Sequence, residues 1–316
     1  MSSPTRVETI TLGDELLLGI RENAHLTYLG IQLAHHGIEP AANLVIRDNP
    51  DDIHLFFSES WKRSDLIITT GGLGPTTDDL TRESIANALD EKLVFDVSVE
   101  QAIQERFKSL HREMPENNLK QCYRPENADI LSNPYGTAPG LFLKKDGKIL
   151  VMLPGPAREM HPMFEDQVVP RLQKEGIFPE IDCYLQIRTA GIGESALAEI
   201  VEPLLDGVDG LILGYCAHAG MVDLRLSSLD SDILSEEKLH QLADHCREAL
   251  GDDFVCFGDR TLAEVIFREL RGLNKTLAVA ESCTGGLLSS QFTEIAGISK
   301  VCHGAAVCYH NYAKVH

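Results

Sequence analysis

Two adjacent aspartates follow a glycine-rich turn in this chain, and together they suggest phosphate and metal binding. The segment reads Gly71-Gly72-Leu73-Gly74-Pro75-Thr76-Thr77-Asp78-Asp79 and joins a strand-like run to a helix expected over residues 78–89. Glycines let the backbone approach a ligand, and amides at a helix N-terminus attract phosphate. Asp78 and Asp79 could hold a hard divalent cation against phosphate oxygens. A plain tight turn with favourable first-turn carboxylates is the alternative. The phosphate-binding residues would be Gly71, Gly72, Gly74 and Thr76.

Three other segments combine polar side chains with glycine or proline. The first, residues 12–19 with a nearby asparagine, carries acids that follow the first strand-like run and could face the same crevice. A surface turn is the alternative there. The second is residues 118–121, followed by the glycine-containing segment 136–140. The third is the strand-loop-helix junction at residues 152–160, which could also simply end a loop. The candidate substrate-binding residues in these segments are Asp14, Glu15, Asn23, Lys120, Gly155 and Glu159.

Strand-like and helix-like runs alternate through residues 1–170. Residues 7–12, 43–46 and 65–70 predict strands, and a helical run follows each of them. This β-α-β-α order indicates an α/β domain with a mostly parallel sheet between two layers of helices. Further along, a Lys145-Asp146-Gly147 turn predicts a hairpin between two more strands.

The rest of the chain predicts two smaller units. Residues 171–257 follow a β-α-β-β-α-β order, which is that of a small split-βαβ module. Residues 258–316 begin another α/β unit, in which a strand over 276–280 leads into Glu281-Ser282-Cys283-Thr284-Gly285-Gly286. From Thr276 this unit has only 41 residues, well short of a usual domain, so we expect it to be truncated.

Charge narrows the choice of partners. The 316 residues include 28 basic and 48 acidic side chains, giving a formal net charge of −20. This sign disfavours nucleic acid and anionic membranes as partners, while a small anionic ligand held by amides or a metal remains possible. The eight cysteines form no C-x-x-C pair that would support a zinc site, and most lie in apolar runs, so we expect reduced thiols packed as small hydrophobic side chains. With no long apolar run or signal-peptide pattern, the protein is expected in the cytoplasm.

Taken in order, these segments resemble the CinA-like family of competence/damage-inducible proteins and nicotinamide-nucleotide amidohydrolases. The resemblance rests on the motifs above and on Leu153-Pro154-Gly155-Pro156, Gly191-Ile192-Gly193-Glu194-Ser195 and Val222-Asp223-Leu224-Arg225-Leu226. The first domain is similar to the molybdopterin-binding fold of MogA, MoaB and MoeA. The resemblance implies a metal-dependent ADP-ribose pyrophosphatase, with Mg, Co or Mn, in residues 1–170. It also implies a nicotinamide mononucleotide (NMN) deamidase in residues 258–316, and a homodimer.

The middle module, residues 171–257, would be KH-like by fold only. Residues 171–256 carry six basic and 17 acidic side chains, and Gly191-Ile192-Gly193-Glu194 stands in place of a GxxG clamp. Both features argue against RNA binding, so we expect a structural role for this module.

In the terminal unit, Ser282 could attack an amide carbonyl while loop amides bind the oxyanion. Cys283 is the competing nucleophile, and a helix N-cap is the alternative role for Ser282. The resemblance assigns the catalytic lysine to Lys314 and its partner to Tyr309. Because Lys314 stands two residues from the end of the chain, we expect little deamidase activity from this chain. The substrate-binding residues here would be Thr284, Gly285 and Gly286.

Two other functions compete with this two-activity hydrolase. The first-domain fold also serves molybdopterin binding and adenylyl transfer. A non-catalytic competence or regulatory factor could likewise bind a nucleotide without turning it over. Incubation with ADP-ribose, NMN and molybdopterin, with and without divalent metal, separates the three.

Overall fold

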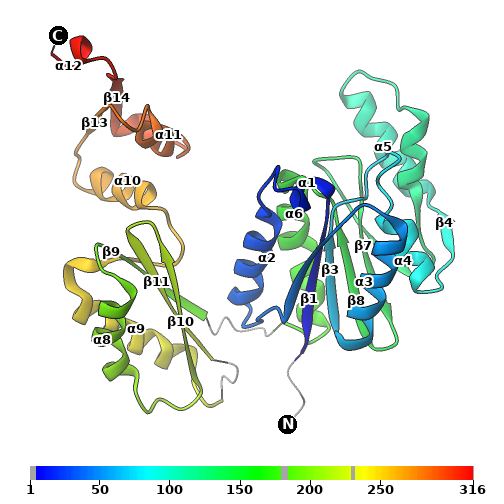
Figure 1. The fold of residues 1–316 in the computed structure, drawn as a ribbon, viewed down its shortest axis with the longest axis horizontal. Helices are drawn as coiled ribbons and strands as arrows, with labels where there is room; N and C mark the ends of the chain where they lie inside the picture. The colour runs from blue at the N-terminus through cyan, green and yellow to red at the C-terminus, as the bar shows by residue number, and fades with distance from the viewer. Residues whose placement is uncertain (1–4, 179–183, 229–231, 316) are drawn as a thin grey trace. The chain divides into compact units, whose positions relative to one another are not determined.

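A six-stranded mixed sheet forms the centre of the first of two compact units, Met1–Asp182 and Cys183–His316 (Figure 1). The structure, a computed structural model, describes residues 5–178, 184–228 and 232–315. The strand order is β2-β1-β3-β8-β7-β6. Four strands pair in parallel: β1 (Val7–Leu12), β2 (Ala42–Ile46), β3 (Leu66–Thr70) and β8 (Lys148–Leu153). β7 (Gly140–Lys145) runs in the opposite direction and pairs with β8 on one side and with β6 (Ala128–Leu131) on the other.

The predicted hairpin between β7 and β8 is confirmed. Its turn residues Asp146 and Gly147 have φ values of 52° and 75°. Two positive φ angles match the twist of the flanking strands, and aspartate followed by glycine tolerates them. The turn therefore reverses the chain at β8, which lies next to β3 in the middle of the sheet.

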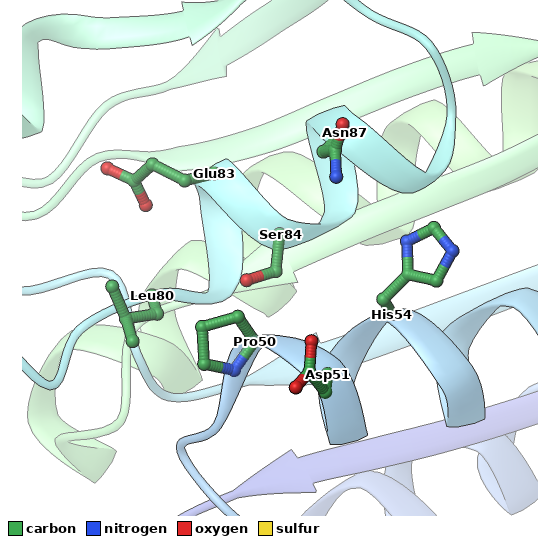
Figure 2. A pocket seen from close by; sticks show the side chains of 7 residues that line it. All are labelled: Pro50, Asp51, His54, Leu80, Glu83, Ser84 and Asn87. Carbon is green, nitrogen blue, oxygen red and sulfur yellow. The ribbon is translucent and has the colours of Figure 1, made fainter.

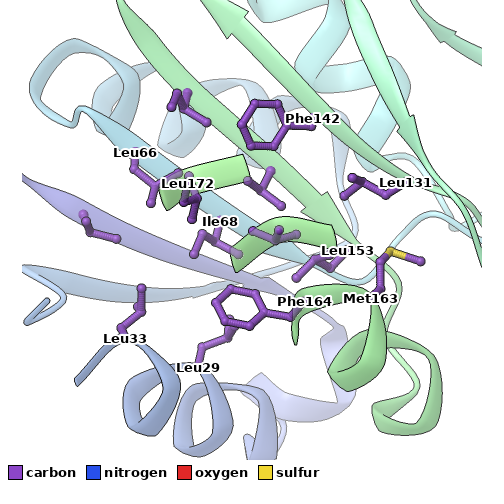
Figure 3. Packing of buried hydrophobic residues seen from close by; sticks show 14 of the residues in the cluster. Leu29, Leu33, Leu66, Ile68, Leu131, Phe142, Leu153, Met163, Phe164 and Leu172 are labelled. Carbon is purple, nitrogen blue, oxygen red and sulfur yellow. The ribbon is translucent and has the colours of Figure 1, made fainter. Parts of the chain in front are cut away.

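Helices cover both faces of this sheet and bury an apolar core on each. One face carries α2 (Ala24–His35), α6 (Ala157–Met163), the π-helical segment η2 (Phe164–Val168) and α7 (Val169–Lys174) (Figures 1 and 3). The other carries α3 (Pro50–Arg63) and α4 (Thr81–Ala88). Alternate strand residues supply both cores, as the two-residue period requires. Leu172 and Phe178 are buried in the first core, so this unit extends beyond its predicted limit at residue 170.

Several elements of the first unit were not predicted from the sequence. After α4 the chain forms β4 (Leu93–Phe95), α5 (Val97–Ser109), the 3-10 helix η1 (Glu116–Cys122) and β5 (Tyr123–Pro125). Val99, Ile103 and Cys122 give these elements a small core of their own. A short α1 (Asp14–Leu17) follows β1. The helix predicted over residues 78–89 begins only at Thr81, so Asp78 and Asp79 lie in the loop before it.

The middle module has the predicted β-α-β-β-α-β order. It consists of β9 (Tyr184–Ala190), α8 (Glu194–Leu205), β10 (Leu211–His218), β11 (Met221–Ser228), α9 (Glu236–Leu250), the short η3 (Gly251–Asp253) and β12 (Phe254–Phe257). The antiparallel sheet has the order β10-β11-β9-β12, and both helices pack on it through one apolar cluster. Arg188 and Asp223 form a bidentate pair, with both N–O distances 2.8 Å, at the centre of this sheet.

The remaining residues form a small parallel pair of strands with short helices. They comprise α10 (Leu262–Gly272), β13 (Leu277–Glu281), α11 (Leu287–Thr293), η4 (Ile298–Lys300), β14 (Cys302–Val307) and α12 (Asn311–Val315). β14 begins three residues earlier than predicted, and it ends before Tyr309. Over the described ranges, no helix combines the length and the apolar character needed to cross a membrane.

Candidate functional site

The carboxyl ends of the parallel strands bring the glycine-rich turn together with the segments that follow β1 and β8. The amide of Gly71 donates to the carbonyl of Leu153 at 3.0 Å, and a Cβ added to Gly155 would lie 3.8 Å from the Cα of Gly71. The amide of Gly13 donates to the carbonyl of Ile46 at 3.2 Å. Crevices at this edge of an open α/β sheet are where such folds bind ligands.

The backbone of the turn requires glycine at two positions. Gly71 has φ of 97°, and an added Cβ would lie 2.6 Å from the carbonyl oxygen of Leu12. Gly72 has φ of 66°, and its Cβ would lie 2.0 Å from Oγ1 of Thr81. The Thr81 hydroxyl donates to the Gly71 carbonyl at 3.0 Å, while its amide donates to that of Gly72 at 3.2 Å. Thr81 thus locks the start of α4 against the turn, which needs glycine for close packing.

Asp79 and Lys120 hold the end of the turn. The amide of Thr76 donates to the Asp79 carboxylate at 2.8 Å, and the Thr76 hydroxyl donates to the same oxygen at 2.5 Å. The Lys120 ammonium donates to the carbonyls of Thr76, at 3.0 Å, and Asp79. The Asp79 side chain is therefore folded back into the turn that it stabilises. The Lys120 charge is placed beside the turn, where the sequence had suggested substrate binding.

Asp78 is the more accessible of the two adjacent acids. Its side chain is exposed, and the neighbouring Thr76 hydroxyl, the local backbone and the Lys120 charge lower its pKa. An exposed, ionised carboxylate next to a glycine-rich turn can face a bound cation directly. The two predicted metal-binding acids are thus placed differently, and Asp78 is the one available to a ligand.

A third acid, Asp48, belongs to the same edge and was missed in the sequence. Burial, together with the negative charges of Asp14, Glu15 and Asp78, raises the pKa of Asp48 to about 6, although the Asp14 backbone opposes the shift. Asp14 and Glu15, which the sequence predicted to face the crevice, are thus close enough to Asp48 to affect its ionisation. Asp48 therefore ionises against the negative charges of three carboxylates, two that follow β1 and one that follows β3. The available signal was the position of Asp48, two residues after the strand.

His25, at the start of α2, also faces this edge and was not singled out in the sequence. Its Nδ1 lies 2.9 Å from the hydroxyl of Thr70, the last residue of β3. Burial lowers the pKa of His25, against opposing effects of the Gly155 backbone and Glu15. The imidazole therefore favours its neutral form next to the carboxylates. No spacing in the sequence connected this histidine with the turn.

Two predicted binding residues, Asn23 and Glu159, have structural partners. Asn23 accepts from the amide of Leu26 at 3.1 Å, which caps α2. Glu159 is buried and accepts from Nδ2 of Asn133 at 2.9 Å. A Cβ on Gly136 would lie only 1.8 Å from the Glu159 carboxylate, so the 133–136 loop packs closely on α6. Both side chains therefore stabilise the backbone around the candidate site.

A cavity of about 470 Å³ lies between α3 and α4 (Figure 2). Two of its lining residues, Pro50 and Leu80, come shortly after Asp48 and Asp79 in the sequence. Figure 2 shows Asp51 and His54 projecting from α3, and Glu83, Ser84 and Asn87 lying along α4. Pro50 and Leu80 complete the lining. None of the residues predicted from the sequence lines this cavity. Its two carboxylates, Asp51 and Glu83, would disfavour a phosphate there.

The donor types at the sheet edge suit a hard cation, but no complete protein cage is present. Within the ranges that the structure describes, no three His, Cys, Asp or Glu side chains are placed to hold a metal ion together. A divalent cation would therefore need oxygen ligands from phosphate and water beside one or two carboxylates. Magnesium sites at phosphates are commonly built in this way.

In the last segment, Ser282 follows β13, and its Oγ is buried without a hydrogen-bond partner. The helix-capping role belongs to Glu281, which accepts from the amides of Leu288 and Ser289, each at 2.9 Å. The Ser289 hydroxyl, the Thr284 hydroxyl and these amides lower the pKa of Glu281 to about 2. The alternative interpretation of Ser282 as an N-cap is therefore wrong.

The predicted catalytic partners of Ser282, Tyr309 and Lys314, form no hydrogen bond with it. Tyr309 lies beyond β14 and Lys314 lies in α12, and both side chains are exposed. Neither is hydrogen-bonded to Ser282, whose Oγ has no partner. The turn formed by Thr284, Gly285 and Gly286 connects Ser282 to α11, with Gly285 and Gly286 at φ of 59° and 104°. Cys283 is also exposed in this turn.

Comparison with known proteins agrees with this architecture. Residues 8–174 match the family described as "Probable molybdopterin binding domain", residues 186–256 the "Damage-inducible protein CinA KH domain", and residues 259–316 the "CinA C-terminal domain". A crystal structure described as the protein CinA with unknown function, from Thermoplasma acidophilum, has a TM-score of 0.50 and 31% identity. It covers 54% of this chain and 99% of its own. The chain thus combines a molybdopterin-binding-type α/β domain with a KH-type module.

Relatives of similar organisation establish the family. A CinA-like protein of Kosmotoga olearia is 41% identical over 314 residues, which cover 98% of this chain and 75% of that protein. Another from Syntrophomonas wolfei is 36% identical over 310 residues, covering 97% and 74%. The chain belongs to the CinA-like family. The expectation that its last unit is a truncated fragment is wrong, because residues 259–316 match the CinA C-terminal domain.

Proposed function

We propose that the first unit hydrolyses the pyrophosphate bond of ADP-ribose with a divalent cation: magnesium, cobalt or manganese. The observation that carries the proposal is the meeting of the glycine-rich turn with Asp48 and Asp78 at one sheet edge. A diphosphate brought next to Asp48 and Asp78 requires a cation that offsets the repulsion between its charge and these carboxylates. The turn and the acids are therefore best explained as two parts of one phosphate-handling site.

Each side chain at this edge has a distinct task in the proposal. Amides of the 71–76 turn bind the phosphate oxygens, and Lys120 adds a positive charge beside them. Asp78 faces the cation, which supplies polarisation of the phosphorus and activation of water when bound. Asp48, with a pKa of about 6, is suited to accept the proton of the attacking water near neutral pH. Asp79 keeps the turn in shape.

The test is hydrolysis of ADP-ribose to AMP and ribose 5-phosphate, measured with and without each metal. Asp78→Asn should abolish metal-dependent turnover while the protein stays folded. Asp90→Asn is the matched control, because Asp90 is exposed, has φ of 52°, and asparagine accepts that conformation well. Turnover of Asp78→Asn at the wild-type rate under saturating metal would contradict the proposal. Molybdopterin binding without ADP-ribose hydrolysis would favour the molybdopterin alternative.

For the last segment we propose NMN deamidation with Ser282 as nucleophile. The buried, unpartnered Oγ supports this. A buried hydroxyl without a hydrogen bond costs stability, and a catalytic role explains why such a group is kept. Attack on the amide carbonyl would release ammonia and leave an acyl-enzyme that water then hydrolyses. Lys314, five residues after Tyr309 in the sequence, would take the Ser282 proton, which requires its side chain to approach the serine. Ammonia release from NMN by the wild type, and its loss in Ser282→Ala, tests this assignment.

A further inference from the structure

The sheet edge that carries the glycine-rich turn continues to the loop after β6, residues 132–139. β8 is parallel to β3, β7 is antiparallel to β8, and β6 is antiparallel to β7. β6 and β3 therefore run in the same direction, and their carboxyl ends lie at the same edge. Three strand spacings separate them, roughly 14 Å.

Close contacts connect the two loops across β8. Gly155, in the loop after β8, lies against Gly71 of the turn. Further along that loop, Glu159 accepts from Asn133 at 2.9 Å and packs against Gly136. Asn133 in turn accepts from the amide of Gly136 at 2.8 Å. The 132–139 loop is therefore held in continuous contact with the phosphate-binding turn through residues 155–159.

A cavity of about 170 Å³ lies between this loop and α5. Its apolar lining includes Ala102, Ile103 and Ile130, and its polar lining includes Asn133 and Thr137. None of the lining residues carries a charge. The Arg106 side chain of α5 donates to the carbonyl of Pro134 at 2.6 Å and to that of Tyr135, so the two walls are fixed to each other. The cavity is thus preformed.

We propose that this cavity binds the uncharged heterocyclic base of the nucleotide whose diphosphate lies at the glycine-rich turn. A phosphate would find no counter-charge there, whereas a flat base can bury its faces against Ala102 and Ile130. Its edge can then hydrogen-bond to the Thr137 hydroxyl, while Asn133, whose amide is fully used within the loop, keeps the wall in place. The separation of roughly 14 Å leaves room for one ribose between the base and the diphosphate. The proposal rests on the proposed pyrophosphatase function and assigns its base specificity to the loop after β6.

The test fills the cavity and leaves the turn unchanged. Ala102→Leu should raise the KM for ADP-ribose about tenfold to a hundredfold, because it removes the room for a stacked base, while kcat changes little. Gln101→Leu, one residue away on α5 and outside the lining, is the matched control and should keep the wild-type KM. Thr137→Val, which keeps the shape and removes one hydroxyl, should raise KM about fivefold. Thermal unfolding checks that each variant is folded.

Direct binding separates this inference from the proposed function. AMP carries a base and ribose 5-phosphate does not, so Ala102→Leu should weaken only AMP binding. If the wild type binds AMP but does not hydrolyse ADP-ribose, and Ala102→Leu loses AMP, the base cavity stands and the pyrophosphatase assignment fails. Unchanged KM and AMP affinity in folded Ala102→Leu would overturn the base cavity even where hydrolysis is observed. A rise in KM confined to His54→Ala would place the base between α3 and α4 and overturn it as well.

Discussion

Replacing Asp48 by asparagine should make the protein more stable at neutral pH and inactive on ADP-ribose. Asp48 is harder to ionise in the folded protein than in the unfolded chain, because burial and its neighbours Asp14, Glu15 and Asp78 oppose its charge. Its ionisation therefore weakens the fold as pH rises from 3.8 towards 6, and the full cost persists above pH 6. Asparagine keeps the shape of the side chain and removes that charge.

The size of the gain follows from the pKa shift. A rise from 3.8 to about 6 spans about two pKa units, each equal to about 1.4 kcal/mol. The ceiling is thus about 3 kcal/mol of unfolding free energy. Asp48 is only partly buried, so solvent screening reduces the expected gain to about 1 kcal/mol. A functional acid that destabilises its own fold is a common compromise at active sites.

Urea unfolding of wild type and Asp48→Asn without divalent metal, at pH 7.5 and again near pH 4, measures the effect. The gain should be present at pH 7.5 and largely vanish near pH 4, where Asp48 is protonated in the folded protein. Asp51→Asn is the control: Asp51 is an exposed first-turn acid of α3, so its loss should slightly destabilise the protein. A variant that is less stable than the wild type at pH 7.5, or a gain that ignores pH, would refute the reasoning.

Three further predictions concern other parts of the chain. Gly72→Ala should lower the unfolding free energy by about 2 kcal/mol or more, since φ is 66° and the new Cβ would clash with Thr81. The midpoint temperature of thermal unfolding and the rate of ADP-ribose turnover should both fall. Glu8 is buried, which opposes its charge, but hydrogen bonds from Arg63 and Arg6 outweigh this and lower its pKa to about 2. Its contribution is therefore complete above pH 4.5 and lost as pH falls towards 2. Glu8→Gln should cost about 2 kcal/mol at pH 7 in urea unfolding, and equal stability of the two proteins would argue against this account. Ser282→Ala should make the protein more stable by about 1 kcal/mol, because a buried Oγ without a partner costs stability, yet abolish ammonia release from NMN; a large loss of stability would reveal a structural role.

Local sequence signals located most of the elements that hold the candidate site. The strand-like runs before Gly13 and Gly71 and the Asp146-Gly147 turn reflect side-chain period and backbone freedom, which are properties of neighbouring residues. The strands β4 to β6 and the 3-10 helix η1 were missed because such short elements carry little periodic pattern, whereas the 13-residue α5 was missed although its buried Val99 and Ile103 have helical spacing. The start of α4 was placed too early because Asp79, which looks like a first-turn acid, instead bonds back to Thr76.

The sequence by itself determined that an α/β domain carries a glycine-rich turn with acids beside it, because those features lie in contiguous residues. Only the tertiary structure decided which acids and loops share that edge. Asp48 joins Asp78 there, and Lys120 reaches the turn from a segment more than 40 residues away. The order of the strands and the reversed direction of β7 bring these residues together. Both features depend on pairing between strands far apart in the sequence, which no local sequence window contains. The same pairing brings the loop after β6 to the proposed base cavity.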